Sequence, residues 1–131
     1  MTAELEGCPF CDHIRRQREL LALRARAVAF ADAHPVSPGH CLVVPRRHEP
    51  DFFELTLEEQ SDIWELVWEL RELIEAERHA KAFNVGINAG TAAGQTVEHA
   101  HVHLIPRYDG DVPDPRGGIR WVIPERAPYW E

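Results

Sequence analysis

The segment HAHVHLIPR, residues 99–107, alternates histidine with small or apolar residues. Successive side chains of a β-strand point to opposite faces, so this alternation predicts a strand that carries His99, His101 and His103 on one solvated face. The intervening residues then point towards the hydrophobic core: Ala100, Val102 and Leu104. The sequence therefore predicts a row of three imidazoles, about 6.6–6.8 Å apart, on a single wet surface of a sheet.

Further elements are predicted around this strand. Residues 55–80, LTLEEQSDIWELVWELRELIEAERHA, have the features of a long helix, because Thr56 and Glu59 form a capping-box start. Its apolar residues recur at steps of three and four and so form one stripe: Ile63, Leu66, Val67, Leu70, Leu73 and Ile74. Strands are expected in four stretches, the first of which holds two short strands or, as the competing interpretation, a helix: 20–32, 40–45, 82–90 and 99–106. This order of elements favours an α+β fold with an antiparallel sheet.

Composition restricts the class of protein. With 131 residues, 44% of them hydrophobic, the chain suits one domain around one core. The net charge of −8 makes non-specific nucleic-acid binding a poor prospect. No apolar run is long enough to cross a bilayer, and the N-terminus has no basic segment followed by an apolar one. We therefore expect no membrane partner and a cytoplasmic location.

Three interpretations of the alternating histidines compete. The first is that they merely occupy a half-exposed strand, which three histidines in register disfavour. The second is a metal site, since two histidines two residues apart on a strand can converge on one zinc ion. The third is nucleophilic catalysis, in which an imidazole attacks a substrate and forms a covalent intermediate. Histidine suits attack on phosphorus near pH 7, because its reference pKa of about 6.5 leaves a neutral ring nitrogen available.

Several motifs together resemble one known family. HAHVHLI matches the alternation of the histidine-triad (HIT) family, FADAHPVSPGHCLVVPRRH (residues 30–48) resembles its N-terminal signature, and NVGINAGTAAGQTVEHAHVHLIPRY (residues 84–108) resembles its C-terminal one. The pair in CPFC, residues 8–11, lies where many bacterial members carry two cysteines. The resemblance implies a HIT-like α+β fold: an antiparallel sheet of about five strands, one long helix, a shorter N-terminal helix, and dimerisation.

The resemblance also divides the chain. It covers residues 8 to about 110, so residues 1–110 are expected to form the HIT domain. Residues 111–131 are rich in proline, glycine and aromatic residues. We expect them to form a tail that packs on the domain or on the partner subunit.

Catalytic roles for individual residues are implied by the resemblance. His101, the middle histidine, would be the nucleophile that attacks the α-phosphorus of a nucleotide and becomes nucleotidylated. Water would then attack the phosphoramidate bond. His103 and His40 match positions that donate hydrogen bonds around the α-phosphate. Thr96 matches a serine or threonine position beside the leaving group and would relay a proton there.

Three more residues match positions that contact the nucleotide. Gln95, together with the backbone amides of AGQT (residues 93–96), would bind the α-phosphate, because amides of a glycine-containing loop can form an anion-binding nest. Asp32 would accept hydrogen bonds from ribose hydroxyls, with a turn-initiating aspartate as the competing interpretation. Asn88 would contact ribose or phosphate, with a loop-ending asparagine as its alternative.

The cysteine pair suggests a metal site. Cys-x-x-Cys binds zinc only if two more ligands come from elsewhere. In bacterial members of the family those ligands correspond here to His48 and His99, so the resemblance implies a structural zinc ion held by Cys8, Cys11, His48 and His99. A thioredoxin-like redox role is disfavoured, because no helix with a suitable apolar pattern is evident after Cys8. The third cysteine, Cys41, is expected in the core.

The function implied by the resemblance is that of a homodimeric nucleotide hydrolase or transferase. The expected substrate is a purine nucleotide, either a dinucleoside polyphosphate or a nucleotide conjugate, cleaved at its α-phosphate. The C-terminal sequence does not resemble that of the phosphoramidate-hydrolase branch of the family. This difference favours dinucleoside polyphosphates as the substrate. Three alternatives remain: a nucleoside phosphoramidate hydrolase, a nucleotide-binding regulatory module without turnover, and a zinc-dependent hydrolase whose metal is bound by the triad.

Overall fold

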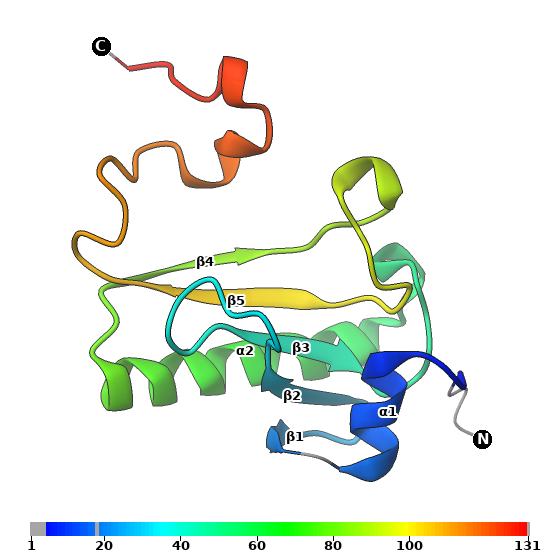
Figure 1. Ribbon diagram of the computed structural model, residues 1–131. Helices are drawn as coiled ribbons and strands as arrows, with labels where there is room; N and C mark the ends of the chain where they lie inside the picture. The colour runs from blue at the N-terminus through cyan, green and yellow to red at the C-terminus, as the bar shows by residue number, and fades with distance from the viewer. Residues whose placement is uncertain (1–4, 18, 131) are drawn as a thin grey trace.

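A five-stranded antiparallel sheet with strand order β1-β2-β3-β5-β4 forms the centre of the computed structural model, which describes residues 5–17 and 19–130 (Figure 1). The strands are β1 (Leu20–Leu23), β2 (Ala27–Ala31), β3 (Cys41–Pro45), β4 (Ala82–Gly86) and β5 (Val102–Arg107). The helices are α1 (Pro9–Arg16) and α2 (Leu57–Arg78), with short 3-10 turns η1 (Phe52–Glu54), η2 (Thr91–Ala93), η3 (Gly118–Val122) and η4 (Pro124–Arg126). The predicted α+β architecture is confirmed, and residues 20–32 hold two strands rather than a helix.

The two faces of the sheet are covered by different helices. The long helix α2 lies along one face (Figure 1), where its apolar stripe packs against Val43, Val102 and Leu104. The short helix α1 packs on part of the opposite face through these buried residues: Phe10, Ile14, Phe30, Leu42 and Val44. Leu42 of β3 is directly paired with His103 of β5, and directly paired residues share a face. His103 therefore lies on the face that carries α1.

Helix α2 begins as its sequence predicts. The Thr56 hydroxyl accepts a hydrogen bond from the amide of Glu59 at 3.0 Å, and Glu59 Oε1 accepts one from the amide of Thr56 at 2.9 Å, so the capping box is complete. The predicted apolar stripe is buried except for Leu73, which is 44% exposed at its edge. Within the described residues, no helix combines the length and the apolar character that a membrane span requires.

The histidine segment begins its strand later than predicted. β5 starts at Val102, whereas the prediction placed the strand start at His99. The amide of His99 donates to Val97 O at 2.9 Å, and the amide of Ala100 donates to Glu49 O at 2.7 Å. These amides therefore bond to loops instead of to a neighbouring strand.

The predicted wet surface is in fact covered. His99 is 0% and His101 6% exposed, since Phe10 of α1 packs edge-on against both rings at centroid distances of 5.7 and 5.1 Å. His103 is half-buried. The intervening residues do point into the core, as predicted: Ala100, Val102 and Leu104. The alternation thus gave the correct faces but not the helix that covers one of them.

Helix α1 begins directly after Cys8, which is its N-cap, and Pro9 occupies its first turn. Proline is favoured there because its missing N–H would have no partner within the helix anyway. The shorter N-terminal helix that the family resemblance implies is therefore confirmed, although the residue pattern after Cys8 had not indicated it. A helix of eight residues has too few turns to show an apolar period in the sequence. The choice between metal and redox chemistry for the cysteine pair thus depends on the geometry of the site.

The C-terminal segment leaves β5 and extends past the edge strand β4 (Figure 1). Ile119 of η3 lies over Gly86 of β4, where a Cβ built on the glycine would be 3.2 Å from Ile119 Cδ1. Aromatic rings of the segment pack against its own arginines, as Trp130 does with Arg116 and Tyr129 with Arg120. Packing of this tail on a partner subunit stays a prediction.

Candidate functional site

The middle histidine is held in a defined tautomer. His101 Nδ1 lies 2.8 Å from the backbone carbonyl of His99. A carbonyl oxygen can only accept, so Nδ1 carries the proton and Nε2 of the neutral ring keeps its lone pair. The ring is buried against Phe10, which fixes its orientation. His101 therefore has the arrangement that a nucleophilic imidazole requires: Nδ1 is bound by an acceptor, and no hydrogen bond occupies Nε2 among the described residues.

A chain of hydrogen bonds sets the tautomers of His40 and His103, so that each ring has a protonated Nε2. The amide of Val36 donates to His40 Nδ1 at 3.1 Å, so Nε2 of neutral His40 carries the proton. That nitrogen lies 3.0 Å from Nδ1 of His103. With Nδ1 of His103 accepting, its Nε2 bears a proton that can be donated to a ligand. The rings of His101 and His103 are edge-to-face with centroids 5.1 Å apart, so the predicted nucleophile and the predicted donor are neighbours.

Burial favours the neutral form of both His40 and His103. Burial lowers the pKa of His40 below its usual value, although the nearby Asp32 carboxylate opposes this effect. Burial likewise lowers the pKa of His103, and the neighbouring His101 and His40 add to the decrease. Neutral rings support the tautomers assigned from the hydrogen bonds.

Asp32 has the turn-initiating arrangement, which was one of its two predicted roles, and its contact with a ribose stays a prediction. Its Oδ1 accepts a hydrogen bond from the amide of His34 at 2.8 Å, which is the turn-initiating arrangement. Its Oδ2 lies 3.4 Å from His40 Nε2 and 4.0 Å from His103 Nδ1. The carboxylate is thus anchored by one oxygen and faces the donor histidines with the other.

Gln95 stabilises the loop between β4 and β5 through three hydrogen bonds. Its Oε1 accepts from the amide of Gly90 at 2.8 Å, and its Nε2 donates to Pro50 O at 2.8 Å and to Val97 O at 3.0 Å. Both ends of the amide are therefore engaged in shaping the loop. Thr96 is exposed in the same loop, and Asn88 is half-buried just after β4. Among the described residues, no hydrogen bond joins either side chain to the three active-site histidines: His40, His101 and His103.

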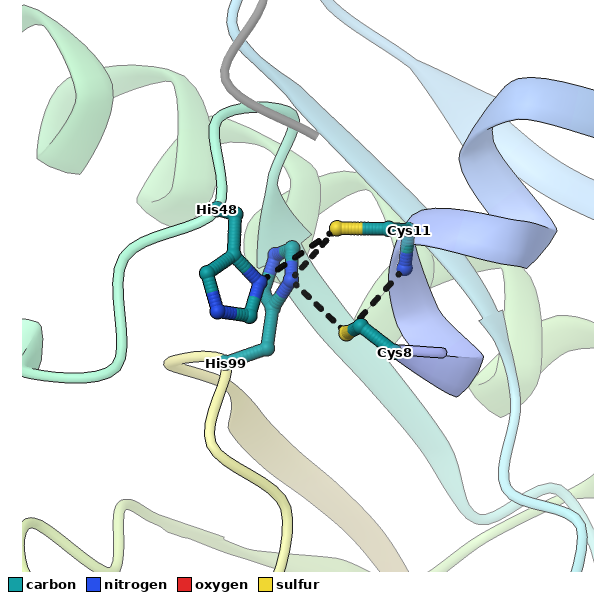
Figure 2. A group of neighbouring side chains, drawn as sticks. All are labelled: Cys8, Cys11, His48 and His99. Carbon is teal, nitrogen blue, oxygen red and sulfur yellow. Dashed lines mark hydrogen bonds between the residues drawn. The ribbon is translucent and has the colours of Figure 1, made fainter. Parts of the chain in front are cut away.

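The predicted metal ligands come together from three separate segments (Figure 2). The Cys8 and Cys11 sulfurs each lie 3.5 Å from His99 Nδ1, and the Cys11 sulfur lies 3.4 Å from His48 Nδ1. Zinc–sulfur distances of about 2.3 Å and zinc–nitrogen distances of about 2.0–2.1 Å, in a tetrahedron, separate ligand atoms by roughly 3.3–3.8 Å. The four residues therefore have the spacing and the chemistry of a closed zinc site.

His99 is prepared as a neutral ligand. Its Nε2 lies 2.8 Å from Pro45 O, so this nitrogen carries the proton and Nδ1 directs its lone pair towards the sulfurs. Burial is the main cause that lowers the pKa of His99 to about 4. Cys41 lies outside this cluster, fully buried with its pKa raised to about 12 by burial, as expected for a core residue.

One other group of possible ligands is present among the described residues. It consists of Asp32, His40 and His103. The close hydrogen bond between His40 and His103 already uses the facing nitrogens of this group. Neither group includes His101, so the described geometry leaves the middle histidine outside both candidate metal sites.

Comparisons with known protein sequences agree with these motifs. The model of the HIT domain matches residues 17–110. A protein of Schizosaccharomyces pombe named bis(5'-nucleosyl)-tetraphosphatase (asymmetrical) is 44% identical over 85 residues, which cover 65% of this chain and 47% of the relative. A Dictyostelium discoideum protein named bis(5'-adenosyl)-triphosphatase is 38% identical over 96 residues, which cover 73% and 64% respectively. The chain thus spans about half to two thirds of the length of these relatives.

Solved structures share the same fold. A HIT family protein from Bacillus anthracis superposes with a TM-score of 0.75 at 40% identity, covering 81% of this chain and 77% of its own. A Zn-bound histidine triad family protein from Mycobacterium smegmatis superposes with a TM-score of 0.74 at 27% identity, covering 88% of this chain and 90% of its own.

Proposed function

Because the chain belongs to the histidine-triad (HIT) family, we propose that it is a nucleotide hydrolase or transferase that cleaves at the α-phosphate of its substrate. The observation that carries the proposal is the bond from His101 Nδ1 to the carbonyl of His99, which leaves Nε2 as an unprotonated nucleophile. The donor pair His40 and His103 lies beside it.

Two displacements make up the proposed reaction. In the first, His101 Nε2 attacks the α-phosphorus, a nitrogen–phosphorus bond forms, and the bond to the leaving group breaks with its electron pair going to the leaving group. The ring becomes cationic, and the His99 carbonyl stabilises its Nδ1 proton. In the second, water attacks the same phosphorus and forms an oxygen–phosphorus bond while losing a proton to the solvent. The nitrogen–phosphorus bond breaks with its electron pair returning to Nε2, so neutral His101 is regenerated. Covalent catalysis of this kind replaces one difficult displacement with two easier ones.

Neighbouring residues supply the remaining tasks in this proposal. His103 Nε2 donates to the phosphoryl oxygens, and His40 holds His103 in the donating tautomer. A single hydrogen-bond donor of this type typically raises kcat by a factor of about 10²–10³. Thr96 relays a proton to the leaving group. Three further residues serve the nucleotide: Asp32 at the ribose, Asn88 at ribose or phosphate, and Gln95 by shaping the loop whose amides bind the α-phosphate.

The proposal includes a structural zinc ion on Cys8, Cys11, His48 and His99. When bound, this ion contributes a cross-link between segments and no reaction chemistry. Its ligands come from the start of α1, from the segment after β3 and from the residues before β5, so it would fix the segment that presents the nucleophile. The spacing of the ligand atoms and the carbonyl of Pro45 behind His99 support this assignment.

Dinucleoside polyphosphates are the favoured substrate class, and a purine nucleotide is the favoured nucleotide. Relatives that match the chain are named as a bis(5'-nucleosyl)-tetraphosphatase and a bis(5'-adenosyl)-triphosphatase, which supports this choice over nucleoside phosphoramidates.

A homodimer also belongs to the proposal, since β4 is an edge strand that carries the exposed Val85, and α2 exposes Trp68. Light scattering of the purified protein measures this assembly directly.

Trapping the intermediate tests the function. Enzyme denatured at alkaline pH during turnover of diadenosine tetraphosphate should gain the mass of a nucleoside monophosphate less one water, on the peptide that contains His101. The variant His101→Ala should show neither adduct nor turnover. Nucleotide binding without turnover in the wild-type protein would instead indicate a regulatory module. Rapid loss of activity on chelation with the fold intact would indicate a zinc-dependent hydrolase.

A further inference from the structure

A pocket of about 550 Å³ opens on the sheet face that carries the histidines, and no step described above uses it. Its volume falls in the range of sites for small organic ligands. Its floor and walls come from β5, β4, the turn before β3 and the C-terminal segment. The lining residues on which the argument depends are Val36, Asn84, Ile105, Arg107, Ile119 and Trp121.

The register of β5 places this pocket directly beside the donor histidine. His103, Ile105 and Arg107 alternate along one half-buried face of β5. Gly86 of β4 pairs with His103, and Asn84 pairs with Ile105. Residues two apart on a strand are about 7 Å apart, so the pocket floor begins one same-face position beyond His103.

In the strand order of the sheet, Asp32 and the floor of the pocket lie on opposite sides of β3. Asp32 directly follows β2, and its amide bonds to the carbonyl of His40 just before β3. Across the sheet the order is β2, β3, β5 and then β4. A nucleoside held at Asp32 therefore leaves the β5–β4 side of His103 free for the other half of a substrate.

The C-terminal segment builds the outer wall. Ile119 covers Gly86, the residue opposite His103. Trp121 is fixed by its indole N–H, which donates to Arg116 O at 2.8 Å. Arg120 holds the following turn by donating to Ala127 O and to Arg126 O, at 2.9 and 2.7 Å. The wall is thus held by hydrogen bonds of its own.

The charges of the pocket are already paired. Arg107, the cation among the described lining residues, forms two hydrogen bonds to the Asp111 carboxylate at 2.8 and 2.9 Å and a third to Asn84 Oδ1 at 2.7 Å. The pairing holds the pKa of Asp111 well below its usual range. A phosphate would therefore find no uncompensated cation here, whereas Ile105 and Trp121 offer apolar and aromatic surface to a flat, neutral group.

We propose that this pocket binds the base of the leaving-group nucleoside. The inference rests on the proposed function, and it specifies that the substrate carries two nucleosides: one on the Asp32 side and the second against Trp121. The polyphosphate then crosses His103 between the two. Base–aromatic stacking is tolerant of base identity, so the pocket selects for the presence of a second nucleoside more than for its identity.

Kinetics with two substrates test the inference. Diadenosine tetraphosphate fills both sides, whereas adenosine 5'-tetraphosphate has the same α-phosphate but no second nucleoside. In Trp121→Ala we expect kcat/KM for diadenosine tetraphosphate to fall by about 5- to 150-fold, mainly through KM, which is the range that stacking of one base on an aromatic ring contributes. The value for adenosine 5'-tetraphosphate should be unchanged, and Trp121→Phe should restore most of the loss.

Val122→Ala is the matched control, because Val122 is an exposed apolar residue next to Trp121 in the same segment and does not line the pocket. It should affect neither substrate. An equal loss with both substrates in Trp121→Ala, no loss with either, or a change in oligomeric state would overturn the subsite. Wild-type protein that turns over neither nucleotide would instead refute the proposed function itself.

Discussion

His101 donates its Nδ1 proton to the backbone carbonyl of His99 at 2.8 Å, while the ring of His99 faces the sulfurs of Cys8 and Cys11 at 3.5 Å. One residue thus serves two neighbouring sites by two different groups. Its backbone carbonyl orients the proposed nucleophile, and its side chain belongs to the candidate metal site. Substitutions can separate these contributions, because a side-chain change leaves the carbonyl in place.

Replacement of the two histidines should therefore differ in effect. His101→Ala removes the nucleophile, and we expect no detectable turnover. His99→Ala removes a ligand but keeps the acceptor carbonyl, so we expect a fall in kcat of about 10–100-fold, the usual effect of disturbing support around a metal site. Steady-state hydrolysis, with circular dichroism to verify folding, measures both. Substantial activity in His101→Ala would contradict its assigned role.

Loss of either paired cysteine should remove the metal. We expect one zinc ion per chain in the wild-type protein and a small fraction of that in Cys8→Ala and Cys11→Ala, together with a lower Tm, because a bound metal stabilises only the folded state. Cys41→Ala is the control, since it removes a buried cysteine from the core without touching the cluster. Elemental analysis and thermal unfolding give the results. Equal zinc content in all four proteins would exclude this site.

The ion pair at the start of α2 should make stability depend on pH. Glu59 is 6% exposed and accepts from Arg47 Nε and Nη2 at 3.1 and 2.9 Å and from the amide of Thr56. Hydrogen bonds from Arg47 are the main cause that lowers the pKa of Glu59. The unfolded chain therefore binds more protons near pH 4, so this stabilisation is present above about pH 4.5 and is lost as pH falls through the lowered pKa.

Glu59→Gln removes this dependence. We expect the variant to be about 1–3 kcal/mol less stable at pH 7, because a buried charged hydrogen-bond network is broken. The difference should narrow as the pH falls below about 4.5, where Glu59 of the unfolded wild-type chain becomes protonated, and it should close as the pH passes the lowered pKa of the folded state. Urea unfolding at a series of pH values gives the two curves. Curves that stay parallel down to pH 3 would show that Glu59 does not carry the linkage.

Local pattern was sufficient to predict the long helix α2 and the faces of β5, but not the short helix α1. The capping box of Thr56 and Glu59 located the start of α2, and the alternation around His103 gave the correct faces of β5. The same period of two cannot tell a solvated face from a covered one, which is why the burial of His101 under Phe10 was missed. That covering helix has only eight residues, too few to show a period.

The atoms that set the chemistry were the hardest to predict. The tautomers depend on backbone groups, namely the carbonyls of His99 and Pro45 and the amide of Val36. Any residue supplies such groups, so no residue type in the sequence marks them. The pocket beside Ile105 likewise depends on how the proline-rich and glycine-rich C-terminal segment packs against β4. The sequence of that segment has no helical or strand period from which its course could be predicted.

The turn before His40 should be sensitive to a single methyl group. Gly39 has φ +91°, and a Cβ there would lie 2.9 Å from Arg78 Cδ and 3.3 Å from Pro106 Cγ. Gly110 also has positive φ, at +78°, but a Cβ there would meet nothing within 4 Å. Both alanine variants are strained by their backbone angle, at about 1–3 kcal/mol each. Only Gly39→Ala also pushes on the turn that presents His40.

Kinetics and unfolding should therefore separate the two glycines. We expect Gly110→Ala to lose stability while kcat stays at the wild-type value. Gly39→Ala should lose stability and also lower kcat by about tenfold or more, because a displacement of His40 disturbs the bond that prepares His103, and misplacement of about 1 Å can cost 10²-fold in rate. A wild-type kcat in folded Gly39→Ala would mean that the position of His40 does not limit the reaction.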